Sequence, residues 1–158
     1  MQFNIDLNRL QKSYRIIQAE IHPDKFVSAN QLEKEQSLIK STEVNDAYQT
    51  LKDPIKRAKY LIKINLESEK NDSTLPPEFL IQQMEWEEHL ESISEQLKEL
   101  EQFRLLIDGE YQKAMSGLEI LCDKDKNWNH AMKILNKIQF INKLNFKITN
   151  QINLIEIK

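Results

Sequence analysis

The side chains of this chain best suited to metal binding or nucleophilic catalysis are three histidines and one cysteine. His22, His89 and His130 lie on separate segments, and no two of them have the HxxxH spacing of a helical metal site. Cys122 is the single cysteine, which excludes an internal disulfide and any metal or iron–sulfur site with several thiolate ligands. A hydrolase or metal enzyme is therefore disfavoured. We expect His89 and His130 on solvated helix faces, and Cys122 as a small apolar residue near a helix end.

A polar corner at His22-Pro23-Asp24 is the one short motif that suggests function. Proline fixes a backbone dihedral and stiffens the turn, so the histidine and the aspartate project from a rigid position. Three residues alone are a weak signal, since a histidine beside an aspartate is usually a capped helix end. Basic side chains near the corner would speed its encounter with an acidic partner. These basic residues are Lys12, Arg15 and Lys25.

Helices must position this corner, because the 158 residues include only two glycines and four prolines. That scarcity disfavours β-sandwiches, barrels and glycine-rich nucleotide loops, and it favours long helices. The apolar spacing predicts a helix from Asp6, a good N-cap, to the residue before Pro23. A second helix is predicted over Gln31–Lys52, and a short third helix over 55–62 follows Asp53-Pro54.

The charges are unevenly spread around the net value of −3. Residues 67–110 hold 3 basic and 13 acidic side chains, whereas residues 124–158 hold 7 and 2. These acidic and basic helical stretches could pack together, and the acidic stretch argues against nucleic acid as a partner. No apolar run approaches the ~20 residues of a membrane span, and no secretion signal is visible. We therefore expect a cytoplasmic protein without a membrane partner.

Several motifs in order resemble the J-domain family: Tyr14-Arg15, HPDKF at 22–26, VNDAYQTLKDP at 44–54 and KRAKY at 56–60. The resemblance implies an antiparallel helical hairpin with the polar corner at its tip, within a J domain over 1–65. It implies docking on a DnaK-type ATPase and faster ATP hydrolysis by that partner, with no catalytic residue in this chain. The family begins with a short aromatic-containing helix. Only Met1–Ile5 stand there, so the leading helix is expected to be missing or truncated, by loss or by a late start assignment. The implied ATPase-binding residues are His22, Pro23, Asp24, Lys25, Lys12 and Arg15.

The second half reads as a polar linker over 66–77 followed by three helices over 78–158. Ser92-Ile-Ser-Glu95 is interpreted as a capping box between the first two, and Gly109 and Gly117 need not break the middle helix. On a helical wheel, Phe79, Trp86, Leu90, Ile93 and Leu97 form the core stripe. Four large apolar residues lie off the core stripes. They either fill a broader core or pack on the first domain, or they form a partner-binding patch with an acidic rim. They are Leu80, Ile81, Met84 and Phe140.

PEFLIQQMEWEEHL at 77–90 and IQFINKL at 138–144 resemble the HscB family, the J-type co-chaperones of iron–sulfur cluster assembly. The resemblance implies an all-α protein, elongated or L-shaped, with the J-domain hairpin joined to a C-terminal three-helix bundle. It implies no cofactor and two partners: an IscU-type scaffold, bound by the bundle, and a HscA/DnaK-type ATPase. The alternative is a general J-domain co-chaperone with another client. The family's scaffold contacts fall on Leu80, Ile81, Met84, Glu85, Glu88 and Phe140.

Overall fold

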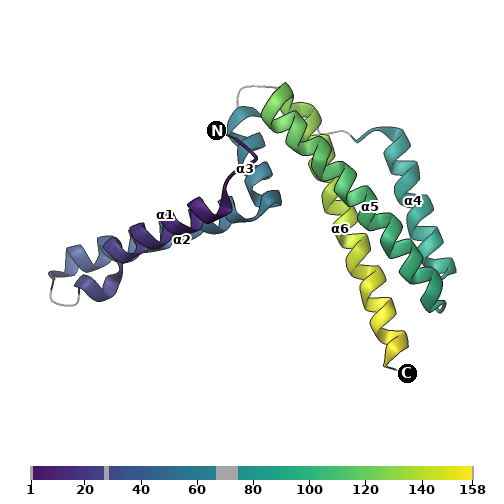
Figure 1. Ribbon diagram of the computed structural model, residues 1–158, viewed down its shortest axis with the longest axis horizontal. Helices are drawn as coiled ribbons and strands as arrows, with labels where there is room; N and C mark the ends of the chain where they lie inside the picture. The colour runs from purple at the N-terminus through teal and green to yellow at the C-terminus, as the bar shows by residue number, and fades with distance from the viewer. Residues whose placement is uncertain (1, 27–28, 67–74, 158) are drawn as a thin grey trace. The chain divides into compact units, whose positions relative to one another are not determined.

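The computed structural model describes residues 2–26, 29–66 and 75–157, and these contain helices and no strand (Figure 1). The expected all-α fold class is confirmed. The chain divides into two compact units, Met1–Leu61 and Ile62–Lys158. The helices are α1 (Leu7–Ile21), α2 (Gln31–Lys52), α3 (Pro54–Leu66), α4 (Pro77–Ser92), α5 (Leu97–Ile120) and α6 (Trp128–Glu156), with a short 3-10 helix, η1 (Pro23–Phe26), and a π-turn, η2 (Leu121–Asp125).

The helix starts in the first unit follow from their capping residues. The Asp6 carboxylate accepts from the amides of Asn8 and Arg9 at 2.9 and 3.0 Å. Asn30 and Glu33 form a reciprocal capping box at the start of α2. Asp53 accepts from the two amides that follow Pro54, so α3 begins at the expected proline. It runs to Leu66, beyond the expected 55–62. Leu66, the first residue of the predicted linker over 66–77, is the buried end of this helix, and residues 67–74 of that linker lie outside the described residues.

The first unit is a hairpin in which α1 and α2 lie side by side (Figure 1). None of the α1 residues is buried. The rings of Tyr14 and Tyr48 stack at 4.1 Å between centroids, and an apolar groove runs beside them. Ahead of α1, residues 2–6 form no helix. Phe3 is nevertheless buried, with the Arg57 guanidinium 5.0 Å from its ring centroid, so an aromatic side chain does pack on α3.

The second unit is a three-helix bundle in which α4 and α6 run in one direction and α5 in the other. Of the core stripe predicted on one helix, Phe79, Trp86, Leu90 and Ile93 are buried, whereas Leu97 begins α5 and is only half-buried. Neither Gly109 nor Gly117 interrupts α5, as predicted. Helix α6 supplies the largest share of the core. Its buried residues are Ala131, Leu135, Ile138, Ile141, Leu144, Ile148 and Ile152.

The chain reverses between α4 and α5 where expected, but the predicted capping box is wrong. Ser92 lies in the last turn of α4, where its hydroxyl donates to the His89 carbonyl at 2.7 Å. The residue preceding α5 is Gln96, which makes no side-chain cap. The turn over residues 93–96 therefore joins the helices without the predicted capping box.

The turn between α5 and α6 is built around Cys122, which is fully buried. Burial, followed by the neighbouring Asp123 carboxylate, raises the pKa of its thiol to about 11. Lys126 adopts a left-handed conformation with φ of 52°, and its ammonium donates to the Cys122 carbonyl at 2.8 Å. The same ammonium lies 5.7 Å from the Trp128 ring centroid. The prediction of a small apolar residue near a helix end is confirmed.

Within the described ranges, every helix is too short or too polar to cross a bilayer. Those ranges also hold no cluster of three histidine, cysteine or acidic side chains that could bind a metal ion.

Candidate functional sites

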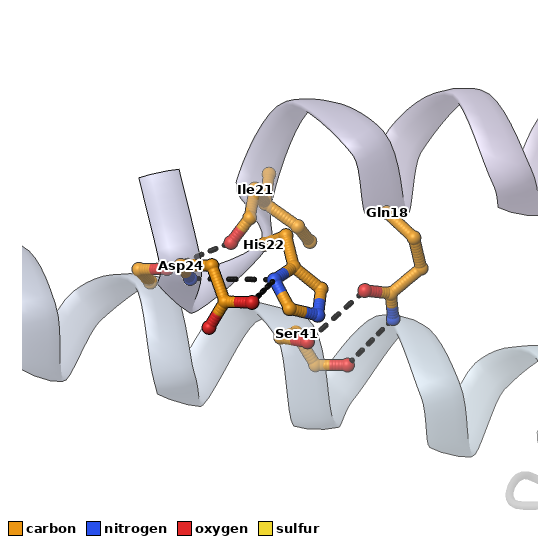
Figure 2. Close-up of polar contacts among 6 residues, drawn as sticks. Gln18, Ile21, His22, Asp24 and Ser41 are labelled. Atoms are coloured by element: carbon orange, nitrogen blue, oxygen red, sulfur yellow. Dashed lines mark hydrogen bonds and ion pairs between the residues drawn. The ribbon is translucent and has the colours of Figure 1, made fainter. Parts of the chain in front are cut away.

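The polar corner is placed by the end of α1 and the start of η1 (Figure 2). His22 leaves the helix with extended backbone, φ −61° and ψ 131°, and Pro23 begins the 3-10 turn. The Lys25 amide donates to the His22 carbonyl at 2.9 Å and closes that turn. The side chains of His22 and Asp24 are 53% and 87% exposed, so both face solvent.

One ring nitrogen of His22 serves two contacts with Asp24. The Asp24 amide lies 3.3 Å from Nδ1, and Oδ2 of its carboxylate lies 3.5 Å from the same atom (Figure 2). A neutral Nδ1 accepts from the amide, whereas a protonated Nδ1 donates to the carboxylate. In either state the His22 ring is tied to Asp24, by its amide or by its carboxylate, while the outer carboxylate oxygen and Nε2 stay available to another molecule.

The expected basic residues lie on the two helices that flank this corner. Lys12 and Arg15 are exposed on α1, and Lys25 is exposed on η1. Arg15 shares a shallow groove with His22. All six expected residues of this site lie in the first unit, and the five polar or charged ones, all but Pro23, are exposed to solvent.

Sequence reasoning missed the residues that join α1 to α2 behind the corner. The hydroxyl of Ser37 donates to the Ile21 carbonyl at 2.7 Å, and Gln18 and Ser41 exchange two hydrogen bonds. Tyr14 donates to Asn45 at 3.3 Å further along. A signal was present: Ser37, Ser41 and Asn45 recur every four residues, which is one helical face.

The off-stripe residues of α4 form an exposed row on the second unit. Leu80, Ile81 and Met84 are 46%, 57% and 64% exposed. Glu85 and Glu88 are exposed on the same helix. We call these five residues the α4 patch. Its apolar centre and acidic positions have the composition of a protein interface.

Phe140 occupies a different environment from the α4 patch. Its side chain is half-buried, with its ring centroid 6.0 Å from that of Phe79 and 6.3 Å from that of Trp86. The wheel put this ring opposite the core stripe of α6. Because α6 packs against both α4 and α5, it has two buried faces, and Phe140 lies on the one that meets α4. Of the four off-stripe residues, it alone helps to fill a broader core.

The acidic and basic stretches do pack together. Lys147 of α6 pairs with Glu87 of α4 at 2.7 Å, and Lys137 lies 3.4 Å from Glu110 of α5. A hydrogen bond from Lys113, and then one from Lys137, lower the pKa of the Glu110 carboxyl against the opposing effect of burial. These pairs hold the bundle together and leave the acidic residues of the α4 patch out of the ion pairs described here.

The remaining histidines stand apart from both sites. His89 and His130 are exposed on α4 and α6, and the His89 ring lies edge-on to Phe103 at 4.7 Å between centroids. The prediction of solvated helix faces is confirmed. The two histidines and His22 form no common site within the described residues.

Comparisons with known proteins match both units. The DnaJ domain family matches residues 2–60, and the family described as "HSCB C-terminal oligomerisation domain" matches residues 75–149. A co-chaperone protein HscB homolog from Photobacterium profundum is 37% identical over 152 residues, which are 93% of this chain and 88% of that protein. The homolog from Haemophilus influenzae is 38% identical, over 94% of this chain and 87% of that protein.

Two solved structures are similar in fold. Chaperone HscB from Vibrio cholerae superposes with a TM-score of 0.79 at 30% identity, covering 94% of this chain and 90% of that one. The human co-chaperone protein HscB gives a TM-score of 0.83 at 29% identity, covering 95% of this chain and 76% of that one.

Proposed function

The chain belongs to the HscB family of J-domain co-chaperones, and we propose that it is an adaptor with one protein-binding site on each unit. The J domain, over 1–65, docks on a HscA/DnaK-type chaperone and stimulates its ATPase. The bundle, over 78–158, binds an IscU-type iron–sulfur scaffold and delivers it to that chaperone, which aids cluster transfer. On this proposal the chain works in the cytoplasm and catalyses no reaction of its own.

The observation that carries the proposal is the exposure of both sites: the charged corner at the end of α1 and the apolar, acidic-rimmed patch on α4. The Asp24 carboxylate is 87% exposed at the end of a helix that carries Lys12 and Arg15. Basic groups steer the encounter with an acidic ATPase surface. The carboxylate then competes for a cation of that partner and shifts its conformational equilibrium, which is coupling between sites without bond chemistry.

The ATPase-facing site is tested with Asp24→Asn. This change removes one exposed charge and keeps the shape, so the far-UV circular dichroism and the affinity for the scaffold should be unchanged. Stimulation of a HscA-type ATPase should fall to the basal rate. If the variant stimulates the ATPase as well as the wild-type chain does, the role assigned to Asp24 is wrong.

The scaffold-facing site is tested with the double variant Leu80→Ala/Met84→Ala. Both side chains are exposed, so the bundle should keep its stability, while calorimetry should show binding to an IscU-type scaffold weakened by about 2–4 kcal/mol, as for two interface anchors. Leu105→Ala is the matched control, since Leu105 is an exposed leucine of α5, 69% accessible. Unchanged binding by the double variant would remove the α4 patch from the proposal. Absence of binding by the wild-type chain would favour a J-domain co-chaperone with another client.

A further inference from the structure

The last turn of α1 depends on a residue of α2 for a hydrogen bond. A helix ends with carbonyl groups that have no amide partner in the helix. The carbonyl of Ile21 would ordinarily accept from the next residues along the chain. Pro23 has no N–H, the Asp24 amide donates to His22 Nδ1, and the Lys25 amide donates to the His22 carbonyl. The Ser37 hydroxyl donates to the Ile21 carbonyl instead, at 2.7 Å.

A second contact lies one turn further along the same two helices (Figure 2). The Gln18 side-chain amide donates to the Ser41 carbonyl at 3.1 Å, and the Ser41 hydroxyl donates to Gln18 Oε1 at 3.0 Å. We call Gln18, Ser37 and Ser41 the interhelix clamp. It joins α1 to α2 by three hydrogen bonds within the last turn before the polar corner.

Among the described residues at this end of the hairpin, no apolar side chain is fully buried. No residue of α1 is buried, and Ser37, 3% exposed, is the buried residue of α2. A buried hydroxyl is retained where its hydrogen bond is made, because a lone buried polar group is costly. Half-buried Ile21 and Phe26 line the same hollow as Ser37, and the interhelix clamp adds directional hydrogen bonds that fix the last α1 turn, and with it His22.

We propose that Gln18, Ser37 and Ser41 are positioning residues for the polar corner, which set the direction of His22 and Asp24 before the chaperone is met. This inference rests on the proposed ATPase-stimulating function. A group held in its binding orientation loses less freedom when it docks, so it binds more tightly at no cost in contacts. The clamp residues do not touch the partner; they act through the backbone of Ile21 and His22.

The test compares Ser37→Ala and Gln18→Ala with Thr42→Val. The Thr42 hydroxyl donates to the Leu38 carbonyl inside α2, so its loss removes a hydrogen bond that does not cross between helices. The co-chaperone is kept below the concentration that saturates the ATPase. Each clamp variant should then stimulate the ATPase about three- to tenfold less than the wild-type chain, the effect of one or two lost hydrogen bonds. Thr42→Val should match the wild type, and all variants should bind the scaffold equally.

A separate readout distinguishes positioning from stability. The variants are compared at a low temperature such as ~10 °C, chosen so that their circular dichroism equals that of the wild type. There the stimulation defect should persist, and hydrogen exchange should accelerate at the Lys25 amide but not in the middle of α1. A defect that disappears on cooling, or exchange that rises uniformly along α1, would refute the inference. Gln18 is only half-buried, so Gln18→Ala decides the matter if Ser37→Ala does not fold. If the wild-type chain itself fails to stimulate any such ATPase, the proposed function fails instead.

Discussion

Phe140 is expected to stabilise the bundle, in contrast to the exposed residues of the α4 patch. Truncating a fully buried phenylalanine to alanine costs about 3–5 kcal/mol. Phe140 is half-buried, so its burial accounts for about 2 kcal/mol. The ring contacts with Phe79 and Trp86, at 6.0 and 6.3 Å, lie within the range of favourable aromatic pairs and add about 0.5 kcal/mol each. Phe140→Ala should therefore destabilise the second unit by about 3 kcal/mol.

Intrinsic fluorescence is a selective assay for this change. The chain has two tryptophans, Trp86 and Trp128, and both lie in the second unit, so urea unfolding followed by tryptophan emission reports on the bundle alone. Met84→Ala is the matched comparison. Because Met84 is 64% exposed, this change should alter the unfolding free energy by less than about 0.5 kcal/mol.

A urea midpoint for Phe140→Ala that equals the wild-type value would refute the packing account of this ring. An equal loss of stability in Met84→Ala would show that the α4 patch is part of the core. The same comparison is a control for the binding experiment. If Phe140→Ala bound the scaffold more weakly, the lower stability of the bundle would contribute as well as any lost interface contact. Phe140→Leu, which keeps most of the apolar volume, should recover much of the stability.

Three further predictions follow from two shifted pKa values, those of Cys122 and Glu110. Cys122, whose thiol pKa is raised from 9.0 to about 11, should react with Ellman's reagent at pH 8 only after unfolding, because burial blocks access and about a hundredfold less thiolate is present. The same shift makes the wild-type unfolding free energy fall as pH rises from about 9 to 11, and Cys122→Ala should lack this fall; equal curves would contradict it. The pKa of the Glu110 carboxyl is lower in the folded chain than its ordinary value of 4.5. Glu110 therefore stabilises the bundle at pH values above 4.5, and this stabilisation is lost as the pH falls through the folded-state pKa. As the pH is lowered, the urea midpoint of Glu110→Gln should fall less than that of the wild-type chain. An equal fall in both would count against the contacts of Glu110 with Lys113 and Lys137.

Helix boundaries in this chain are predictable where a local chemical signal sets them. Asp6 and Asp53 cap α1 and α3 at the expected places, because an aspartate before a helical run satisfies two free amides. The turn after α4 has no comparable signal. Its serines suggested a capping box, but Ser92 bonds backward to His89, a choice that depends on how α4 ends in three dimensions.

The two candidate sites differ in how far they could be predicted. The exposed α4 patch follows from helical periodicity, since a single wheel separates Leu80 and Met84 from the core stripe. Phe140 could not be placed in this way, because a wheel assumes one buried face and α6 has two neighbours. The interhelix clamp was also missed. Which hydroxyl meets which carbonyl depends on the register between α1 and α2, and helical periodicity carries no information about that register.

The arrangement of the bundle has a consequence for the order in which it is made. The neighbour of α4 across the aromatic cluster is α6, the last helix of the chain, whereas α5 and α6 are joined by a short turn and share the most extensive contact. During synthesis, α4 leaves the ribosome well before α6 exists, so Phe79 and Trp86 remain uncovered while α5 is being translated. The α5–α6 hairpin has the more local contacts and should form first, after which α4 docks. Until then the aromatic face of α4 is exposed to solvent, and during this interval the nascent chain is most prone to wrong contacts.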